Sequence, residues 1–434
     1  MFAHGIDAAR FTPQPPTSAS PGPGRMISGG GDIAFRSLLV PSYLPGAMPQ
    51  IRDRGRVHGL QSEVPAVKRR EHGPEGALAD RAGSVPGRGA CSNPEARFES
   101  VRHSAEDDGW TRADAGTPEL HTVVSTEQAR SIITRNRSPD LSFAQSINPY
   151  RGCEHGCIYC YARATHAYLG FSAGLDFESR LVAKENAVHV LREELSRPGY
   201  RCAVIALGTN TDPYQPVERR WRITRELLEL LEECGHPCMI VTKSALVERD
   251  LDLLVRMAAR RLVKVFVSVT TLDRVLARRM EPRAAAPQRR LAALATLAAA
   301  GVPTGVLVAP LIPALNDAEL ERILEAAHEA GCREAGYGLL RLPHEVRDLF
   351  EEWLLCHYPL KAAHVLSLLR QARGGRDDDD ARFGLRMRGE GVLAALIEHR
   401  FDGACRRLGL ERRDADLDTG SFRPPGAGGQ LPLW

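Results

Sequence analysis

Residues 148–163 read NPYRGCEHGCIYCYAR, and they begin inside QSINPY (145–150), the first apolar run that we predict as a strand. Three of the chain's ten cysteines, Cys153, Cys157 and Cys160, fall within this stretch. Thiolates stabilise clustered iron, and so short a loop brings three sulfurs around one site. The spacing therefore predicts a metal centre directly after the first strand.

The same residues leave other interpretations open. Three cysteines on a four-iron cluster leave one iron without a protein ligand, and an open position distinguishes a reactive metal centre from a structural one. A structural zinc ribbon needs a second ligand pair, for which His155 and His166 are the nearest candidates, and neither completes a ribbon. Three thiols without a metal are the remaining alternative. Gly152 and Gly156 permit the tight backbone path that a metal-binding loop needs.

Beyond the cysteines, short apolar runs alternate with longer amphipathic segments, which predicts repeated βα units on a parallel sheet. The predicted strands span residues 145–150, 203–208, 238–243, 263–271, 303–310 and 335–343. The predicted helices between them span residues 224–234, 245–261, 288–300 and 317–331, the last with Asp317 as its N-cap and Gly331 at its end. Six units favour an α/β fold, a partial (βα)6 TIM-like barrel, over a doubly wound sheet. Functional residues are then expected at the carboxyl ends of the strands.

The remaining chain divides by composition. Residues 1–120 carry clusters of proline, glycine and serine without a helical or strand period, which predicts a low-complexity, disordered region with Met26 and Met48 as alternative starts. We predict the barrel over residues 121–343, a helical extension over 344–410 and a flexible tail over 411–434.

Composition also excludes several classes of protein. No apolar stretch approaches the roughly 18 residues that span a bilayer, and the amino terminus lacks an apolar signal core, so we expect a cytoplasmic protein without a membrane partner. Ten cysteines in 434 residues are too few for a disulfide scaffold. A net charge of +3 does not by itself indicate a polyanionic partner, because nucleic-acid binding depends on a local patch.

The segment CEHGCIYC (153–160) resembles the cluster loop of the radical S-adenosylmethionine (SAM) superfamily, Cys-x3-Cys-x-aromatic-Cys, with Tyr159 in the aromatic position. The resemblance implies that Cys153, Cys157 and Cys160 hold a [4Fe–4S] cluster whose open iron chelates S-adenosylmethionine. It also implies reductive cleavage of S-adenosylmethionine to a 5′-deoxyadenosyl radical, an electron donor such as flavodoxin or ferredoxin, and a partial (βα)6 barrel.

Further residues are implied to contact S-adenosylmethionine. Tyr159 stands near the adenine, and the loop GTNTDPYQP (208–216) replaces the Gly-Gly-Glu-like sequence that often meets the amino group. The implied cofactor-binding residues are Tyr159, Thr209, Asn210, Asp212, Ser268, Thr270, Pro310 and Asn316. Ordinary structure is the alternative for each segment: an Asn/Asp turn, β-branched strand filling at 268–271, and a proline-stiffened loop with a helix cap at 309–317.

Within the superfamily, INPYRGCEHGCIYCYAR, ALGTNTDPYQP and VTKSALVERDLDLL resemble the spore photolyase-related (DNA repair photolyase-like) group. This resemblance implies a carbon–carbon lyase that acts on a DNA lesion with the help of a hydrogen-donating cysteine. No cysteine is assignable to that role, and the catalytic residue stays unknown. The candidates by default are Cys202, Cys234, Cys238, Cys332, Cys356 and Cys405, and each also fits a buried core position.

Two features bear on nucleic-acid partners. One is a run of basic residues that would contact several phosphates if it faced one way, with a solvated helix face as the alternative. Its members are Arg256, Arg260, Arg261, Lys264, Arg274, Arg278, Arg279, Arg283, Arg289 and Arg290. The other is the terminal QLPLW, which resembles the peptide that docks on the bacterial sliding clamp through Gln430, Leu431, Leu433 and Trp434. A frayed tail is its alternative.

Three hypotheses follow. The first is a radical SAM enzyme acting on DNA, the second a radical SAM enzyme acting on RNA, a peptide or a small metabolite. The third is a clamp-tethered iron–sulfur protein that binds nucleic acid without turnover. Release of 5′-deoxyadenosine after reduction separates the first two from the third.

Overall fold

The computed structural model defines residues 85–98, 120–376, 382–410 and 417–426. All the described residues belong to the unit Pro74–Trp434. Most of the region predicted as disordered lies outside the described residues. So do the four candidate clamp-binding residues, Gln430, Leu431, Leu433 and Trp434.

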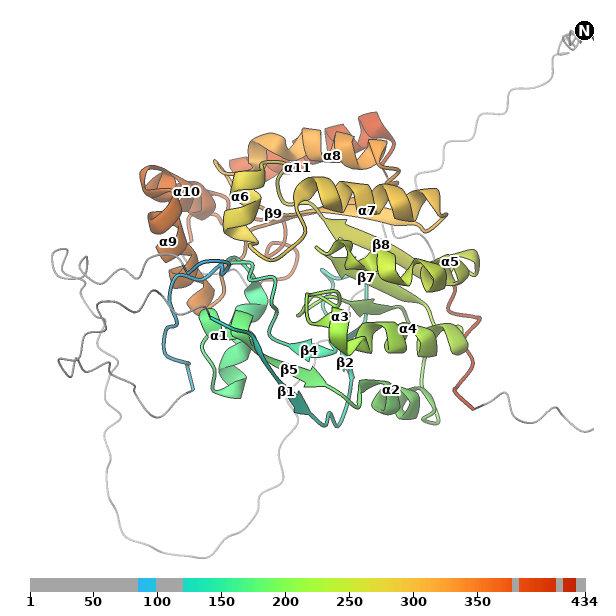
Figure 1. Cartoon of the computed structure of the whole chain (residues 1–434). Coiled ribbons are helices and arrows are strands. Elements are labelled where there is room, and N and C mark those ends of the chain that lie inside the picture. The colour runs from blue at the N-terminus through green and yellow to red at the C-terminus, as the bar shows by residue number, and fades with distance from the viewer. Residues whose placement is uncertain (1–84, 99–119, 377–381, 411–416, 427–434) are drawn as a thin grey trace, which may run out of the picture. The chain divides into compact units, whose positions relative to one another are not determined.

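The main sheet has seven strands (Figure 1). They are β2 (Ile133–Arg135), β3 (Gln145–Ile147), β6 (Ile205–Leu207), β7 (Cys238–Thr242), β8 (Val263–Ser268), β9 (Thr304–Leu311) and β10 (Glu334–Leu339). Their order is β10-β9-β8-β7-β6-β3-β2, and from β3 to β10 each strand pairs in parallel with the next strand of this sheet. Strand β2 is antiparallel to β3. All six predicted strands are confirmed, and they form the predicted partial TIM-like barrel.

Helices follow most of the parallel strands. They are α1 (Leu175–Ser179), α2 (Ala187–Leu195), α3 (Glu218–Trp221), α4 (Ile223–Glu233), α5 (Leu251–Ala259), α6 (Arg274–Met280), α7 (Pro287–Ala299), α8 (Leu320–Glu329), α9 (Glu345–His357), α10 (Pro359–Gln371) and α11 (Val392–Leu408), with 3-10 helices η1 (Tyr161–Leu169), η2 (Ala245–Asp250) and η3 (Asp317–Glu319). Figure 1 shows α4, α5 and α7 in a row beside the sheet. Asp317 is not the predicted N-cap: its carboxylate accepts from the Ala314 amide at 2.8 Å. Gly331 ends the helical segment as predicted, with φ +94°.

Successive side chains of a strand point to opposite faces of the sheet. The side chains on the face that the helices cover form the main core. Ile205, Ile240 and Val265 belong to the large buried cluster with the helix residues Leu227 and Leu231. The opposite face carries the smaller cluster of Ala206, Met239 and Phe266. In a TIM-like barrel this opposite face is the interior, so the barrel interior next to the strand ends is apolar.

A second, three-stranded sheet escaped the sequence analysis. It has the order β1-β5-β4, formed by β1 (Val123–Glu127), β4 (Tyr150–Arg151) and β5 (Arg180–Lys184). The two-residue strand β4 has no period to detect, and the β1–β5 pairing joins distant parts of the chain. Strand β4 leads directly into the cysteine loop, so this sheet fixes where the loop begins.

Two segments predicted as disordered or flexible are anchored by long-range contacts. In residues 85–98, the amides of Gly89 and Ala90 each donate to the Glu178 carboxylate at 2.8 Å. In residues 417–426, the Arg423 amide donates to the Cys234 carbonyl at 2.8 Å, and the Phe422 ring lies 5.2 Å from that of His236. Neither anchor depends on a local period, which is why composition suggested disorder.

The predicted helical extension consists of α9, α10 and α11. Helix α11 lies beside α8, and the ring of Phe401 is 4.7 Å from that of Tyr337 on β10. Within the part of the chain that the structure describes, no helix is both long and apolar enough to cross a bilayer.

Candidate functional site

The three loop cysteines lie where the strands end, as predicted. Cys153 and Cys157 are each 7% exposed, and Cys160 is half-buried. The loop backbone is held from outside: the Cys153 amide donates to the Phe177 carbonyl at 2.9 Å, and the Ile158 amide donates to the Met280 carbonyl at 3.0 Å. The loop is therefore a fixed part of the fold.

Gly152 and Gly156 adopt the backbone conformation that the sequence predicted. Their φ angles are +74° and +68°, in the left-handed region that favours glycine. A Cβ on Gly156 would lie 2.6 Å from the Glu178 carboxylate, and one on Gly152 would lie 2.7 Å from the Leu181 side chain. The loop consequently packs against its surroundings at both glycines.

A buried arginine donates hydrogen bonds to the backbone of the cysteine loop. Arg163, fully buried, donates to the Cys157 carbonyl at 2.9 Å and to the Gly156 carbonyl at 3.0 Å, and it pairs with the Glu178 carboxylate. On the other side, the buried Gln215 accepts from the Glu154 amide at 2.8 Å. Sequence reasoning missed both supports: Gln215 is distant in the chain, and Arg163, although it lies in the quoted stretch, has no spacing that marks it as buried.

A cavity of about 100 Å³ lies against the cysteines. The residues that line it include Cys153, Cys157, Cys160, His155, Tyr161, Gly208, Thr209, Asn210, Thr211, Asp212, Val241, Thr242, Lys243 and Ser268. Four predicted cofactor-binding residues, Thr209, Asn210, Asp212 and Ser268, are thus brought to the cysteines by the ends of β6 and β8. The wall contains no cysteine beyond the three of the loop among the described residues.

Asn148 organises the loop that follows β6. Its side-chain oxygen accepts from the amides of Asn210 at 2.8 Å and Thr211 at 3.3 Å, and its amide group donates to Thr209 Oγ1 at 3.2 Å. Asn148 belongs to the first quoted stretch, yet sequence reasoning gave it no role. Its position at the end of β3 is the signal that would have found it.

Asp212 is the most heavily bonded side chain in the wall. It accepts from Thr242 Oγ1 and the Lys243 amide, both at 2.7 Å, and its Oδ2 lies 3.3 Å from His155 Nδ1. Burial raises the pKa of the Asp212 carboxyl, but His155 and these hydrogen bonds outweigh burial and lower it to about 2. A permanently charged carboxylate therefore joins the β6 and β7 loops to the cysteine loop.

Lys243 is a wall residue that sequence reasoning missed. Of the described residues that line the cavity, it alone carries a permanent positive charge. Burial lowers the pKa of Lys243, but negative charge at Cys157 and Glu281 outweighs burial and raises it. Its place directly after β7 is the strand-end position where functional residues are expected, so the sequence held a signal for it.

Tyr159 and Thr270 lie behind the cavity wall and not in it. Both hydroxyls donate to the buried Glu281, Thr270 at 2.6 Å, and Arg290 pairs with the same carboxylate. Burial raises the pKa of Glu281, but Arg290 and Lys243 outweigh burial and lower it to about 2. This network is a rigid backing for the cysteine loop.

The predicted residues from the β9 region are also outside the cavity wall. The fully buried Asn316 donates to the Thr270 carbonyl at 2.8 Å and the Pro310 carbonyl at 2.9 Å, and it accepts from the Ile312 amide at 2.6 Å. Pro310 lies half-buried in β9. Asn316 thus ties the ends of β8 and β9 together.

The six default cysteine candidates do not reach the cavity. Cys234, Cys238, Cys332 and Cys405 belong to the core cluster between sheet and helices. Cys202 is half-buried and Cys356 is exposed. The core interpretation holds for four of them, and the hydrogen donor stays unassigned.

The donor set fits an iron cluster better than a single ion. Three ligand atoms that share one metal ion lie within about 4.8 Å of one another, and among the described residues the three loop sulfurs do not meet this condition. His155 is engaged with Asp212, and His166 Nε2 lies 3.0 Å from the Arg180 carbonyl, so neither histidine completes a zinc site. Burial raises the pKa of the Cys157 thiol to about 12, so metal binding must displace its proton.

The run of basic residues does not form one face. Lys264 is buried in an ion pair with Glu334 at 3.2 Å, and Arg290 is buried against Glu281. On the surface, Arg256 pairs with Glu232 at 2.7 Å. The buried Lys264 and Arg290 fit neither a phosphate-binding face nor the alternative of a solvated helix face, whereas the exposed Arg256 fits a solvated helix face.

A separate groove of about 460 Å³ adjoins the cysteine loop at His155. Four arginines line it, namely Arg219, Arg249, Arg283 and Arg289, together with Glu248. Arg249, Arg283 and Arg289 are paired with acidic neighbours, whereas Arg219 is exposed to solvent. The groove therefore presents the exposed Arg219 beside the loop.

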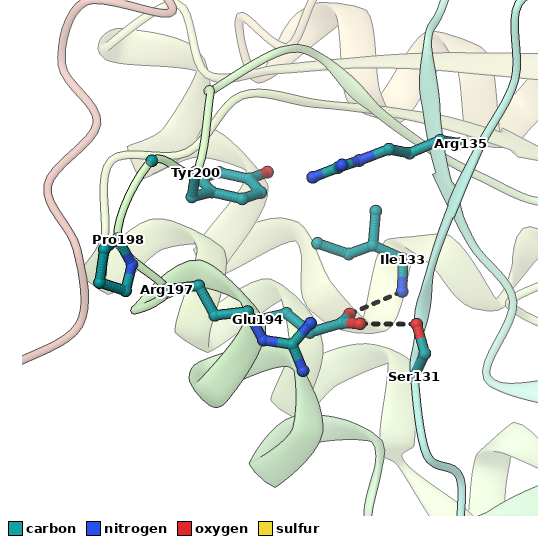
Figure 2. A pocket seen from close by; sticks show the side chains of 8 residues that line it. Ser131, Ile133, Arg135, Glu194, Arg197, Pro198 and Tyr200 are labelled. Atoms are coloured by element: carbon teal, nitrogen blue, oxygen red, sulfur yellow. Dashed lines mark hydrogen bonds between the residues drawn. The ribbon is translucent and has the colours of Figure 1, made fainter.

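Figure 2 shows a cavity of about 500 Å³ that lies elsewhere. It is lined by residues of β2, the end of α2 and the loop that leads into β6, on the amino-terminal side of the sheet. The Glu194 carboxylate in it accepts from Ser131 Oγ at 2.6 Å and from the Ile133 amide at 2.9 Å. In barrels this side serves stability, so the cysteine cavity is the candidate site.

Comparisons with known proteins agree with this geometry. The profile of the radical SAM superfamily matches residues 147–327. The uncharacterized protein Rv2578c of Mycobacterium tuberculosis is 40% identical over 233 residues, which cover 53% of this chain and 68% of that protein. The uncharacterized protein MJ0683 of Methanocaldococcus jannaschii is 28% identical over 192 residues, 44% of this chain and 69% of that protein.

Among solved structures, spore photoproduct lyase complexed with dinucleoside spore photoproduct is similar, with a TM-score of 0.46 and 17% identity over 66% of this chain and 80% of that one. The superfamily profile includes the cysteine loop and the ends of β6, β7 and β8, which build the cavity. The chain therefore belongs to the radical SAM superfamily, and its cofactors are a [4Fe–4S] cluster and S-adenosylmethionine.

Proposed function

We propose that this radical SAM enzyme acts on DNA, as a lyase that repairs a damaged base. The observation that carries the radical chemistry is the convergence of Cys153, Cys157 and Cys160 on one cavity with a lysine and polar strand-end residues. When bound, the cluster and S-adenosylmethionine supply a carbon radical that abstracts hydrogen from the substrate.

The chain's own residues bind and orient the two cofactors. The three thiolates hold iron, and the Lys243 ammonium is placed to pair with the carboxylate of S-adenosylmethionine. Thr209, Asn210 and Ser268 offer hydroxyl and amide groups for its remaining polar atoms. We propose these four residues as cofactor-binding. Tyr159, Thr270, Pro310 and Asn316 keep the wall in place.

Two observations support DNA as the substrate. Residues 147–163 and 206–216 resemble the spore photolyase-related group. The groove beside the cysteine loop is lined by four arginines, and Arg219 among them is exposed to solvent, where it can contact a phosphate. RNA, a peptide or a small metabolite remain the alternative substrates, and binding of nucleic acid without turnover the alternative function.

Product analysis tests the proposal. Anaerobically reconstituted protein is reduced with dithionite in the presence of S-adenosylmethionine and a panel of damaged oligonucleotides, and 5′-deoxyadenosine and repaired bases are quantified. We expect 5′-deoxyadenosine, and more of it with one lesion than with undamaged DNA. Absence of 5′-deoxyadenosine supports the non-catalytic alternative. Release that no oligonucleotide stimulates, but that RNA or a peptide does, supports the other substrates.

A matched pair of variants tests the groove. Arg219→Ala should weaken binding of the oligonucleotide and lower the dependence of binding on salt, because a phosphate contact is lost. Arg322→Ala removes an equally exposed arginine from α8 and should change neither. Equal affinities of the two variants would count against the groove as the DNA site.

Two protein partners are also proposed. The terminal Gln430-Leu431-Pro432-Leu433-Trp434 is proposed to dock on the bacterial sliding clamp, its apolar residues entering a preformed pocket. Deletion of residues 430–434 should abolish clamp binding and spare 5′-deoxyadenosine release, whereas equal clamp affinity would refute docking. An electron donor such as flavodoxin or ferredoxin is proposed to replace dithionite in the cell.

A further inference from the structure

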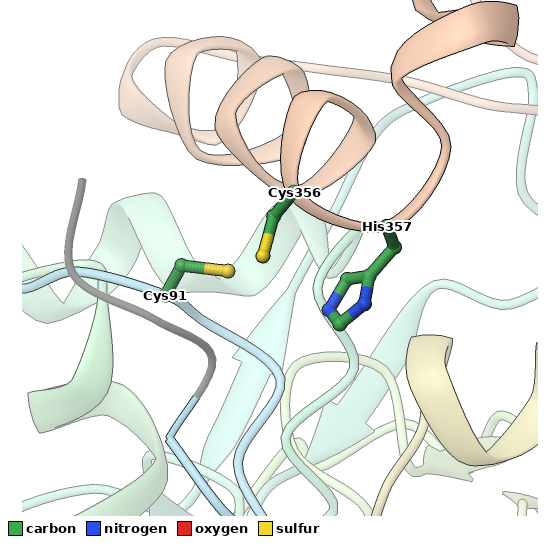
Figure 3. Close-up of side chains that lie close together, drawn as sticks. All are labelled: Cys91, Cys356 and His357. Carbon is green, nitrogen blue, oxygen red and sulfur yellow. The ribbon is translucent and has the colours of Figure 1, made fainter. Parts of the chain in front are cut away.

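Three metal-binding side chains meet outside the cysteine loop (Figure 3). Cys91 comes from the 85–98 segment, and Cys356 and His357 come from the end of α9. Their ligand atoms, two sulfurs and one imidazole nitrogen, all lie within 4.8 Å of one another. Figure 3 shows the two sulfurs directed toward each other with the His357 ring beside them.

The fold holds both sides of this group in place independently of any metal. The Cys91 side is fixed by the Gly89 and Ala90 amides on Glu178, and by Ser92 Oγ, which donates to Glu352 on α9 at 2.6 Å. Helix α9 is fixed by Trp353, whose indole donates to the Arg279 carbonyl at 3.1 Å. The three donors are therefore brought together before an ion binds, which lowers the entropic cost of binding.

The donor set selects the kind of ion. Two thiols and an imidazole are the ligands of zinc, whereas calcium and magnesium require oxygen ligands. Tetrahedral zinc at about 2.3 Å from sulfur and about 2.0 Å from nitrogen separates its ligand atoms by somewhat under 4 Å. Atoms within 4.8 Å of one another need only small rotamer adjustments to reach that geometry.

The charges are compatible with a divalent cation. Burial, followed by Arg279, lowers the pKa of His357, so its ring is the neutral form that binds metals. Burial, and then the adjacent Cys356, raises the pKa of the Cys91 thiol to about 12, so a metal ion that binds this sulfur displaces its proton. Two thiolates neutralise Zn²⁺, which limits its repulsion by the Arg279 guanidinium.

We propose that Cys91, Cys356 and His357 bind one Zn²⁺ ion that ties the 85–98 segment to α9. Water fills the fourth position on the side of Cys356, which is exposed. The tie has a consequence for the candidate site. It holds Gly89 and Ala90 on Glu178, the carboxylate that pairs with Arg163 beneath the cysteine loop.

Metal analysis of the whole chain tests the proposal. Protein from zinc-supplemented cells is purified anaerobically, reconstituted with iron and sulfide, and analysed for both metals. Wild type should contain about one zinc per chain besides iron, with two sulfur neighbours at about 2.3 Å in the zinc-edge absorption spectrum. Cys356→Ser and His357→Gln should lose zinc and retain iron. Cys157→Ala should lose iron and retain zinc.

A matched control is Cys202→Ser, which removes a half-buried cysteine elsewhere and should keep both metals. Three results would overturn the proposal. They are wild type with no more zinc than the Cys356→Ser variant, zinc that disappears with Cys157→Ala, and a disulfide between Cys91 and Cys356 in the anaerobically purified protein. Because zinc and iron are counted separately, none of these results depends on turnover of S-adenosylmethionine.

Discussion

Asp212 Oδ2 lies 3.3 Å from His155 Nδ1, and this contact joins the loop after β6 to the middle of the cysteine loop. The same carboxylate accepts from Thr242 and from the Lys243 amide at the end of β7. One side chain therefore connects three segments of the cavity wall. The negative charge of Asp212 therefore helps to hold the cysteine loop in position, independently of the cofactors.

Asp212→Asn should consequently loosen the cysteine loop. The substitution keeps the size of the side chain but places an amide where Oδ2 accepted hydrogen bonds, and such losses in buried sites cost about 1–3 kcal/mol each. We expect a lower unfolding midpoint in urea and faster loss of iron to a chelator. Asp252→Asn, at an exposed pair with Arg225, is the control and should change iron retention little.

Removing one loop thiolate should remove the cluster. Cys157→Ala is expected to abolish the brown colour and the iron and sulfide content of anaerobically reconstituted protein, because a thiolate ligand is lost. Cys202→Ala, a cysteine outside the cavity, should reconstitute as wild type. Unchanged iron in Cys157→Ala would mean that the metal lies elsewhere.

The cysteine loop and the barrel were within reach of the sequence, because both depend on local patterns. Each parallel strand carries its own apolar run, and the spacing of Cys153, Cys157 and Cys160 lies within one loop. Lys243 comes directly after β7, where a functional residue is expected. It was nevertheless missed, because a single lysine in VTKS has no distinctive spacing.

The supports of the site were out of reach for a physical reason. Arg163 meets Glu178, Glu178 meets the 85–98 segment, and Glu281 meets Arg290 through tertiary packing alone. A buried charge looks like a surface charge in a sequence, and composition placed residues 85–98 in a disordered region. The resemblance to the radical SAM superfamily implied Thr270 and Asn316 as cofactor-binding residues, and in the structure their polar groups form hydrogen bonds to the protein.

Two glycines with nearly the same φ angle allow the cost of a crowded Cβ to be measured separately from the cost of the left-handed conformation. Gly156 and Gly170 have φ of +68° and +71°, but a Cβ on Gly156 would meet Glu178 at 2.6 Å, and a Cβ on Gly170 would meet nothing within 4 Å. Gly170→Ala should cost about 1 kcal/mol from the left-handed conformation alone. Gly156→Ala should cost more and also reduce iron retention. Equal effects in thermal unfolding and iron analysis would show that Glu178 moves freely.

The cavity lysine should govern affinity for S-adenosylmethionine. Lys243→Met keeps the apolar part of the side chain and removes its charge, so a charge-assisted hydrogen bond worth about 1.5–3 kcal/mol is lost. That loss corresponds to a Kd about tenfold higher or more, measured by anaerobic titration calorimetry. Lys361→Met on α10 is the control and should bind as wild type. An unaltered Kd for Lys243→Met would remove this residue from the cofactor site.

Adjacent arginines on α7 test the buried backing of the site. Arg290 is 1% exposed and pairs with the fully buried Glu281, whereas its neighbour Arg289 is half exposed and pairs with Glu248. Arg290→Met leaves a buried carboxylate without its partner and should cost about 3–5 kcal/mol in urea unfolding, against less than about 1 kcal/mol for Arg289→Met.

The pKa of Glu281, lowered to about 2, adds a pH dependence. Its contribution is fully present above the ordinary glutamate pKa of about 4.3 and is lost as the pH falls toward about 2. The advantage of wild type over Glu281→Gln should therefore shrink below about pH 4, and a difference that stays constant with pH would show that folding does not lower the pKa of this carboxyl.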